Sequence, residues 1–234
     1  MFELALDFPR KNALSTATMD AIAARIERAG GEPLLLVGAP DAFSAGLDLK
    51  EVASLDDAGM RVFLARLESL MRALFLYPGP TVAAVTGHAI AGGCILALCC
   101  DHRAATLEPR ARIGLNEVAL GLTFPPTVFR ICRQRIAPQH LERVLLGAQL
   151  FTTAEAERYS LVDEVVADPV AKGRTRLQEL AAHPPLAYAS TKRRLREASV
   201  AVGEAETRAF ETEALAAWTA PELKARLAAA LAKR

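Results

Sequence analysis

The feature that most constrains the fold is a pattern that occurs twice: an apolar run, a turn of small residues, and a helix-like stretch. Residues 33–38 are a continuous apolar run, and the turn FSAGLD follows at 43–48. Residues 81–85 form a second run, and the turn AIAGGC follows at 89–94. Continuous apolar runs of this length are typical of strands buried on both faces of a sheet. Strands that alternate with helices indicate an α/β fold.

Other segments extend this alternation over the first two-thirds of the chain. Ser15 is a candidate N-cap for a helix that continues with helical apolar spacing to the Gly30-Gly31 pair. Residues 113–121 are expected to form a loop, as are residues 87–93. The remaining expected elements are helices at 61–77, 94–100, 138–146 and 153–159, and short strands at 4–8, 104–106 and 162–166.

After residue 168 the composition changes to Ala, Leu, Arg and Glu, with few strand formers. This change predicts helices at about 170–182, 184–198, 203–218 and 221–233. We therefore divide the chain into a core with the active site, residues 1–168, and a C-terminal helical region, residues 169–234. An apolar stripe that includes Phe210, Leu215 and Trp218 is expected to pack on the core or on a neighbouring subunit.

The composition indicates which kinds of binding partner and which cellular compartment to expect. The net charge of +1 gives no reason to expect binding to nucleic acid or to an anionic membrane. The apolar stretch at 89–100 is too short to span a bilayer, and no signal peptide is visible, so a cytoplasmic protein is expected. Three of the four cysteines lie in one apolar stretch without metal-ligand spacing, which predicts buried free thiols and fits a reducing compartment.

The two turns and one acid predict a kind of chemistry. Each turn can leave backbone N–H groups free at the start of a helix, and two such groups aimed at one point would stabilise an oxyanion. Glu117, within IGLNE at 113–117, could move a proton, and its apolar neighbours predict burial and a raised pKa. Together these features suggest enolate chemistry. Taken alone, the glycines are explained more simply by tight turns, and Glu117 could be a solvated loop acid.

Several ordered segments resemble the crotonase (enoyl-CoA hydratase/isomerase) superfamily. They are NALS at 12–15, FSAGLDLKE at 43–51, GHAIAGGC at 87–94, CDHR at 100–103, GAQLFT at 147–152 and VDEVV at 162–166. The resemblance implies a crotonase-like spiral of ββα units with a C-terminal helical region involved in trimerisation. It also implies an acyl-CoA thioester substrate and a homotrimer or a dimer of trimers.

The resemblance also implies roles for individual residues. By motif position, the amides of Leu47 and Gly92 would form an oxyanion hole for the thioester oxygen, and Glu117 would be the catalytic base. Residues expected to contact coenzyme A are Ala45, Asp48, Lys50 and Gly93, although a structural role is favoured for Asp48 and a solvated one is equally open for Lys50. No metal or redox cofactor is expected, since coenzyme A is part of the substrate.

One departure from the family pattern bears on the reaction. Hydratases of this superfamily carry a first catalytic glutamate where this chain has Ile95, so Glu117 stands alone. A single base is enough for a 1,3-proton shift, and the motifs are similar to those of mitochondrial-type Δ3,Δ2-enoyl-CoA isomerases. The TFPP segment at 123–126 also differs from the hydratase pattern. A hydratase, a hydrolase, a decarboxylase or a non-catalytic acyl-CoA-binding protein remain alternatives.

A second departure concerns the N-terminus, where residues 1–11 precede the NALS segment and the family usually has a longer strand pair. Among other polar residues, we expect hydrogen-bonding or packing roles for His88 and Asp101. Asn116 could orient the base or cap a turn. The basic cluster at 192–196 is expected to face solvent, with coenzyme A phosphates as the alternative.

Overall fold

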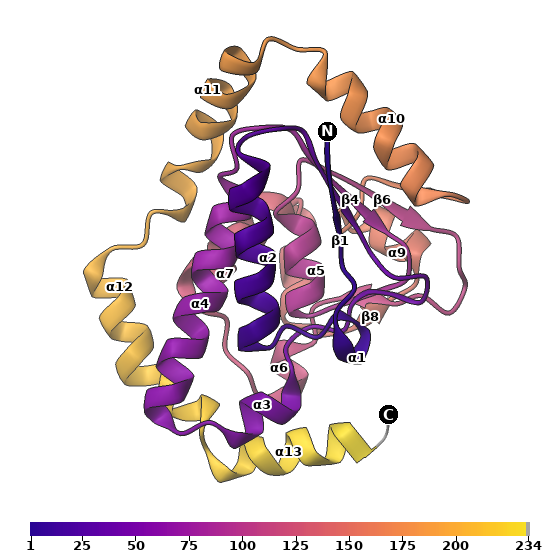
Figure 1. Ribbon diagram of the computed structural model, residues 1–234. Helices are drawn as coiled ribbons and strands as arrows, with labels where there is room; N and C mark the ends of the chain where they lie inside the picture. Colours follow the sequence, from indigo (N-terminus) through magenta and orange to yellow (C-terminus); the bar gives the residue numbers. More distant parts are fainter. Residues whose placement is uncertain (233–234) are drawn as a thin grey trace.

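The computed structural model describes the backbone of residues 1–232 and the side chains of residues 1–229, and it contains two sheets (Figure 1). All neighbouring strands of the larger sheet are parallel, in the order β1 (Phe2–Ala5), β2 (Leu34–Val37), β4 (Thr81–Val85), β6 (His102–Thr106) and β9 (Glu164–Val166). The smaller sheet has the order β3 (Ala42–Ser44), β5 (His88–Ile90), β7 (Ile113–Gly114) and β8 (Leu150–Phe151). Its first three strands are parallel, and β8 is antiparallel to β7.

The chain builds the two sheets together as a spiral. Strands β2, β4 and β6 of the larger sheet are each followed by a strand of the smaller sheet and then by one or more helices. Each turn of the spiral is thus a ββα unit. The predicted α/β fold is confirmed. The prediction missed β5 and β7, which lie within segments expected to be loops, because strands of two or three residues have too short an alternation to recognise.

Helices cover both faces of the larger sheet. Helices α2 (Thr16–Ala29), α4 (Asp57–Phe75), α5 (Gly92–Leu98) and α7 (Pro126–Arg135) group together on one side in Figure 1. Helix α10 (Pro169–Ala181) lies on the other face, where Leu35, Val82 and Ala84 form a small apolar cluster with Leu177. Their neighbours along the strands, such as Leu34 and Ala83, belong instead to the main core. Strands buried on both faces therefore read as continuous apolar runs.

Local capping explains where the helices start and end. The Ser15 hydroxyl accepts a hydrogen bond from the Thr18 amide at 3.1 Å, and Gly30 ends α2 with φ of 56°. Helix α4 begins before the expected residue 61 because Asp56 caps it, accepting from the Gly59 amide at 2.8 Å. The expected helix at 138–146 is a 3₁₀ turn followed by a short helix, and α7 was not predicted. Bounds of the other early elements are α1 (Pro9–Asn12), α3 (Leu49–Ser54), α6 (Glu117–Leu120), η1 (Pro138–His140), α8 (Leu141–Leu145) and α9 (Thr153–Arg158).

The C-terminal region runs along one side of the molecule and returns across its lower end, where α13 (Pro221–Ala232) lies near α3 and α6 (Figure 1). The helix expected at 203–218 is divided into three pieces of different helical type. Residue 233 of the last expected helix lies outside the described residues. The elements of this region are α11 (Pro185–Arg196), η2 (Ala198–Val200), α12 (Glu204–Ala209), the π-helical turn η3 (Phe210–Ala214), the 3₁₀ turn η4 (Leu215–Trp218) and α13 (Pro221–Ala232).

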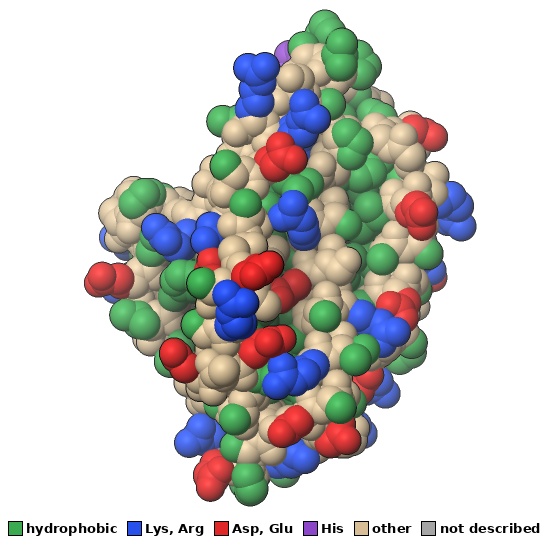
Figure 2. Space-filling model, turned by 90° about the vertical axis from the view of Figure 1, so that its left-hand side faces the viewer, with side chains coloured by type: hydrophobic (Ala, Val, Ile, Leu, Met, Phe, Trp, Pro, Cys, Tyr) green, Lys and Arg blue, Asp and Glu red, His purple; other side chains and the backbone are tan. Residues whose placement is uncertain are grey.

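Ion pairs join this region to the core. Arg61 of α4 pairs with Glu211 at 3.2 Å, and Arg130 of α7 pairs with Glu206 at 2.6 Å. Figure 2 shows the face to which α11 and α12 belong, and there basic and acidic side chains are interspersed with hydrophobic ones. This face therefore carries no large field of one sign, in line with the net charge of +1.

The prediction for the basic cluster at 192–196 is wrong for two of its members. Lys192 and Arg196 are buried and pair with the Asp101 carboxylate, at 2.9 and 2.8 Å respectively. Asp101 also accepts a hydrogen bond from the Thr81 amide, so its predicted structural role is confirmed. Because Lys192 and Arg196 are four residues apart, both lie on the inner face of α11. The sequence of the basic cluster does not show which of its members face inward. Arg193 and Arg194 are exposed, as expected.

The four cysteines are free and buried, as predicted. Burial raises the pKa of the Cys94, Cys99, Cys100 and Cys132 thiols, so they are poor nucleophiles. No helix in the described part of the chain is long and apolar enough to cross a membrane.

Candidate active site

Three neighbouring parallel strands bring the candidate residues together. Strand β3 pairs with β5, and β5 pairs with β7. The segment with Leu47 follows β3, the segment with Gly92 follows β5, and the segment with Glu117 follows β7. Because the carboxyl ends of parallel neighbours meet at one edge of a sheet, segments far apart in the sequence converge there.

The first turn is fixed by backbone hydrogen bonds to an earlier segment. The Leu14 amide donates to the Gly46 carbonyl at 2.8 Å, and the Asp48 amide donates to the Leu14 carbonyl at 3.1 Å. The Ser44 hydroxyl donates to a carbonyl of the same early loop at 2.7 Å. The amide of Leu47 lies between these bonded groups and has no acceptor among the described residues.

The second turn lies against the first. A Cβ atom on Gly92 would be 3.7 Å from the Leu47 nitrogen, and one on Gly46 would be 3.5 Å from the Gly92 nitrogen. Ala91, just before Gly92, has φ of 50°, a conformation that disfavours residues with a side chain. Gly92 is the first residue of α5, and within residues 1–232 its amide has no acceptor either. Two unpaired amides thus lie side by side.

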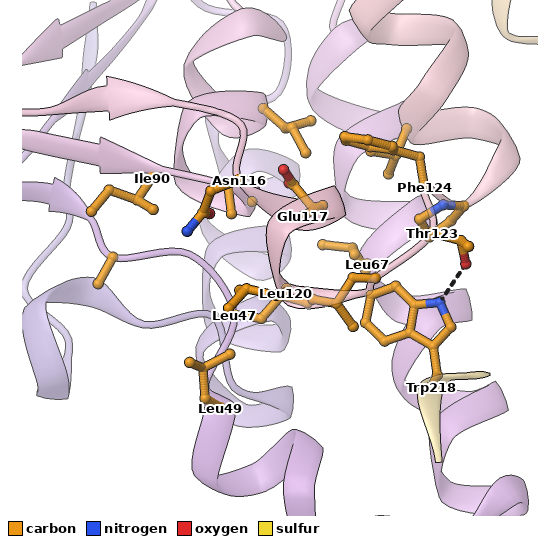
Figure 3. Close-up of a pocket in the computed structure, with 17 residues that line it drawn as sticks. Leu47, Leu49, Leu67, Ile90, Asn116, Glu117, Leu120, Thr123, Phe124 and Trp218 are labelled. Carbon is orange, nitrogen blue, oxygen red and sulfur yellow. Dashed lines mark hydrogen bonds between the residues drawn. The ribbon is translucent and has the colours of Figure 1, made fainter. Parts of the chain in front are cut away.

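The two turns border a cavity, drawn in Figure 3, whose empty space is about 510 Å³ when the open solvent at its mouth is included. Most of the lining is apolar, and the polar side chains are those of Asn116, Glu117 and Thr123. Among the seventeen residues that line it, Glu117 is the one that can ionise. The apolar and backbone lining comes from Ala45, Leu47, Leu49, Leu67, Ile90, Ala91, Gly92, Ile95, Leu120, Leu122, Phe124, Pro125, Val128 and Trp218.

Glu117 begins the short helix α6, and its carboxyl group points into the cavity (Figure 3). The residue is 6% exposed, and Oε2 has no hydrogen-bond partner in the described structure. Burial disfavours the charged form and raises the pKa of the Glu117 carboxyl group to about 8. A carboxyl group in this state can take up and release a proton near neutral pH.

Asn116 and Ile95 line the same cavity as Glu117. The Asn116 side chain does not cap α6, so the turn-capping alternative is wrong, and its buried Oδ1 atom has no partner among residues 1–232. Ile95, on α5, is 2% exposed and contributes only aliphatic atoms. The position that the hydratase pattern reserves for an acid is therefore apolar here.

The residues expected to contact coenzyme A lie in different places. Ala45 lines the cavity, and Lys50 is exposed on α3. Asp48 is buried, caps α3 by accepting from the Lys50 amide at 3.1 Å, and pairs with Arg10. Gly93 packs against the first turn, because a Cβ there would be 2.3 Å from the Ser44 carbonyl oxygen. Their contact with coenzyme A remains a prediction.

His88 has the predicted hydrogen-bonding role, since its Nδ1 accepts from the Arg112 amide at 3.1 Å. The sequence analysis missed the part of the cavity built by Thr123 and Trp218. The sequence did show a single tryptophan on the apolar stripe of the C-terminal region. It did not show which part of the core this stripe would pack against. In the described part of the chain, no group of three or more His, Cys, Asp or Glu side chains could hold a metal ion.

Comparison with known proteins identifies the family. The sequence profile of the family described as Enoyl-CoA hydratase/isomerase matches residues 1–226. The chain belongs to the enoyl-CoA hydratase/isomerase family. It is therefore an enzyme of the crotonase superfamily, and its spiral of ββα units is the fold of that superfamily.

Relatives within this enoyl-CoA hydratase/isomerase family carry different names. The mitochondrial enoyl-CoA delta isomerase 1 of Mus musculus is 32% identical over 198 residues, which are 82% of this chain and 68% of that protein. The crotonyl-CoA hydratase of Syntrophomonas wolfei is 33% identical over 66% of this chain and 61% of that protein. The crystal structure of human mitochondrial delta3-delta2-enoyl-CoA isomerase matches with a TM-score of 0.92 and 26% identity, covering 99% of this chain and 92% of that one.

Proposed function

We propose that this enzyme is a Δ3,Δ2-enoyl-CoA isomerase, which moves a double bond by a 1,3-proton shift. The observation that carries the proposal is the cavity with a single ionisable group. Glu117 shares the cavity with the apolar side chain of Ile95, and two unpaired amides border the same cavity. This arrangement suits a reaction in which one proton moves between two carbons and no water is added.

In the proposed reaction, a 3-enoyl-CoA binds with its thioester oxygen on the amides of Leu47 and Gly92. The Glu117 carboxylate takes a proton from C2, and the electron pair of that C–H bond enters a dienolate whose negative charge lies on the thioester oxygen. Each amide donor typically lowers such a barrier by about 3 kcal/mol. The dienolate then takes the same proton from Glu117 at C4, which leaves the double bond between C2 and C3.

Hydration of a 2-enoyl-CoA is the alternative, since one relative is named crotonyl-CoA hydratase. That reaction needs a water molecule to be activated and a proton to be delivered to carbon, which hydratases of the superfamily divide between two carboxylates. Ile95 cannot activate water, and most of the residues that line the cavity with it are apolar. This observation favours isomerisation over hydration.

The remaining parts of the proposal follow from the family resemblance. Coenzyme A would enter as part of the substrate, past Ala45 and the Lys50 end of α3, and no metal or redox cofactor is needed for the shift. A homotrimer or a dimer of trimers is the proposed assembly.

The test is a product analysis in deuterated water with trans-3-hexenoyl-CoA and, separately, trans-2-hexenoyl-CoA. We expect a 2-enoyl-CoA from the first substrate, with the composition of the substrate apart from exchanged hydrogen. We expect no 3-hydroxyacyl-CoA, which would have gained a molecule of solvent. Glu117→Gln should lower the isomerisation rate by roughly 10²–10⁴-fold while acyl-CoA binding persists. Hydration as the main reaction, or an active Gln variant, would overturn the proposal.

A further inference from the structure

The end of the cavity away from the two amides is closed by Trp218. In Figure 3 the indole ring lies beyond Leu67 and Leu120, on the side of the cavity opposite Leu47 and Ile90. Trp218 is 2% exposed, and its Nε1 donates a hydrogen bond to the Thr123 hydroxyl at 3.0 Å. An acyl chain that extends from the amides past Glu117 would meet this ring.

We propose that Trp218 limits the length of the acyl chain, so that the enzyme takes short- and medium-chain enoyl thioesters and rejects long-chain ones. This inference deepens the proposed function and rests on it for the identity of the ligand. The argument has three steps: the wall is fixed, its surroundings are apolar, and the space in front of it is small.

The wall is fixed from both sides. Trp218 ends the 3₁₀ turn η4, whose first residue, Leu215, is also buried. Directly after it, the Thr219 hydroxyl donates to the Asp57 carboxylate at 2.5 Å, at the start of α4. Further along, Lys224 donates to the Leu55 carbonyl at 3.2 Å. With its ring nitrogen also bonded, the indole is held across the cavity and does not swing freely.

The surroundings of the wall suit a hydrocarbon chain. The residues drawn near the ring in Figure 3 include Leu67, Leu120 and Phe124, and the cavity lining also contains Leu122 and Val128, all aliphatic or aromatic. The one hydroxyl of the lining near the ring, that of Thr123, accepts the indole N–H. A charged group on the acyl chain would lose its water here, where Thr123 is the one polar side chain beside the ring among the described lining residues. Each added methylene, by contrast, should raise affinity about four-fold until the chain reaches the ring.

The volume in front of the wall sets the class of substrate. A methylene group takes up about as much space as a water molecule, roughly 30 Å³, and the cavity measures about 510 Å³ including its mouth. A hexadecenoyl chain alone would fill this space and leave none for the thioester. Because this volume includes open solvent at the mouth, it is an upper bound, and a long chain exceeds it while the indole stays in place.

The first experiment uses the protein's own fluorescence, because Trp218 is the single tryptophan in the chain. The unmodified enzyme is titrated with saturated butyryl-, hexanoyl-, octanoyl- and decanoyl-CoA, which cannot isomerise. We expect the emission to stay unchanged with butyryl-CoA and to shift with the longer chains, once they contact the indole. Equal responses to all four thioesters, or none to any of them, would overturn the inference.

The second experiment compares Trp218→Ala with wild type on trans-3-enoyl-CoAs from hexenoyl to tetradecenoyl. For wild type we expect kcat/KM to fall at least ten-fold between octenoyl and tetradecenoyl. For Trp218→Ala we expect the ratio of the tetradecenoyl to the octenoyl value to rise at least ten-fold, because the cavity is extended. If the folded variant had the same ratio of tetradecenoyl to octenoyl kcat/KM as wild type, the proposal would be wrong.

Two variants separate the wall from general stability. Leu215→Ala weakens the packing of the same segment without lining the cavity, so its chain-length ratio should equal that of wild type. Trp218→Phe retains most of the wall should Trp218→Ala fail to fold, and a smaller shift in the same direction is expected. If length-dependent fluorescence is seen but no thioester is isomerised, the proposed reaction fails while the acyl cavity stands.

Discussion

Glu117 and Ile95 line one cavity from two different helices, and their side chains differ in the property on which the reaction depends. Glu117 is buried, its Oε2 is unpaired within the described structure, and its carboxyl group has a pKa of about 8. Ile95 offers no second proton acceptor. Glu117 thus supplies the one exchangeable proton of this pair near neutral pH. In a pair of glutamates, two carboxylates would repel each other.

The raised pKa predicts the pH dependence of the isomerisation. The base must be a carboxylate to take the C2 proton, so kcat/KM should rise with pH and level off above about pH 8, the pKa of the group in the free enzyme. Initial rates with trans-3-hexenoyl-CoA across pH 5.5–9.5 measure this. A profile that is flat above about pH 5.5 would contradict the proposed environment of Glu117.

The same group predicts a pH-dependent stability. Between the unfolded pKa of 4.5 and the folded value of about 8, the folded protein holds a proton that the unfolded chain has released. The free energy of unfolding should therefore fall with rising pH across this interval, by at most about 1.4 kcal/mol per unit. Glu117→Gln removes this dependence, so its Tm should exceed that of wild type most at pH 8. Equal Tm differences at pH 5 and pH 8 would contradict the prediction.

Replacing Ile95 with glutamate should change the balance of reactions. A second carboxyl group in the cavity would raise the pKa of the pair and lower the isomerisation rate, and it could admit slow hydration of 2-enoyl-CoA. Ile95→Gln is the matched control, because it introduces a polar group of the same size without charge. Product analysis of both variants measures the effect, and equal hydration by the two would mean that the charge is irrelevant.

The buried cluster around Asp101 should dominate the attachment of α11. Asp101→Asn leaves Lys192 and Arg196 buried without their carboxylate, which should lower the free energy of unfolding by about 3–5 kcal/mol. Glu211→Gln breaks the exposed ion pair with Arg61 and should change the free energy of unfolding by less than about 1 kcal/mol. Urea unfolding of both variants tests this, and similar losses would show that burial of the cluster does not matter.

The contact between the two turns can be tested with a single methyl group. Gly93→Ala would put a Cβ 2.3 Å from the Ser44 carbonyl oxygen, so we expect a loss of about 1–3 kcal/mol and lower activity. Gly203→Ala is the matched control, since a Cβ there would meet no atom within 4 Å. Thermal unfolding and isomerase rates of both proteins decide the matter. A stable, fully active Gly93→Ala variant would mean that the two turns can move apart.

The sequence predicted the features that depend on neighbouring residues. Ser15 and Gly30 mark the ends of α2, and the apolar run at 81–85 is the central strand β4. It also predicted the burial of Glu117, because the residues around it are apolar. The sequence did not predict features that depend on which parts of the chain contact each other. Lys192 and Arg196 look like solvated charges until Asp101 is beside them, and Trp218 looks like any core residue until Thr123 accepts its N–H.

Leu47, Gly92 and Glu117 follow strands from three successive turns of the spiral, and each turn lies against the next through the smaller sheet. Each turn contributes one of the three groups, so a site built from any two turns would lack either one amide or the base. During refolding, catalysis should therefore return only with the last of these long-range pairings and later than helical content, because contacts distant in sequence are slow to form. The recovery of activity therefore reports when the last of the three turns has packed against its neighbour.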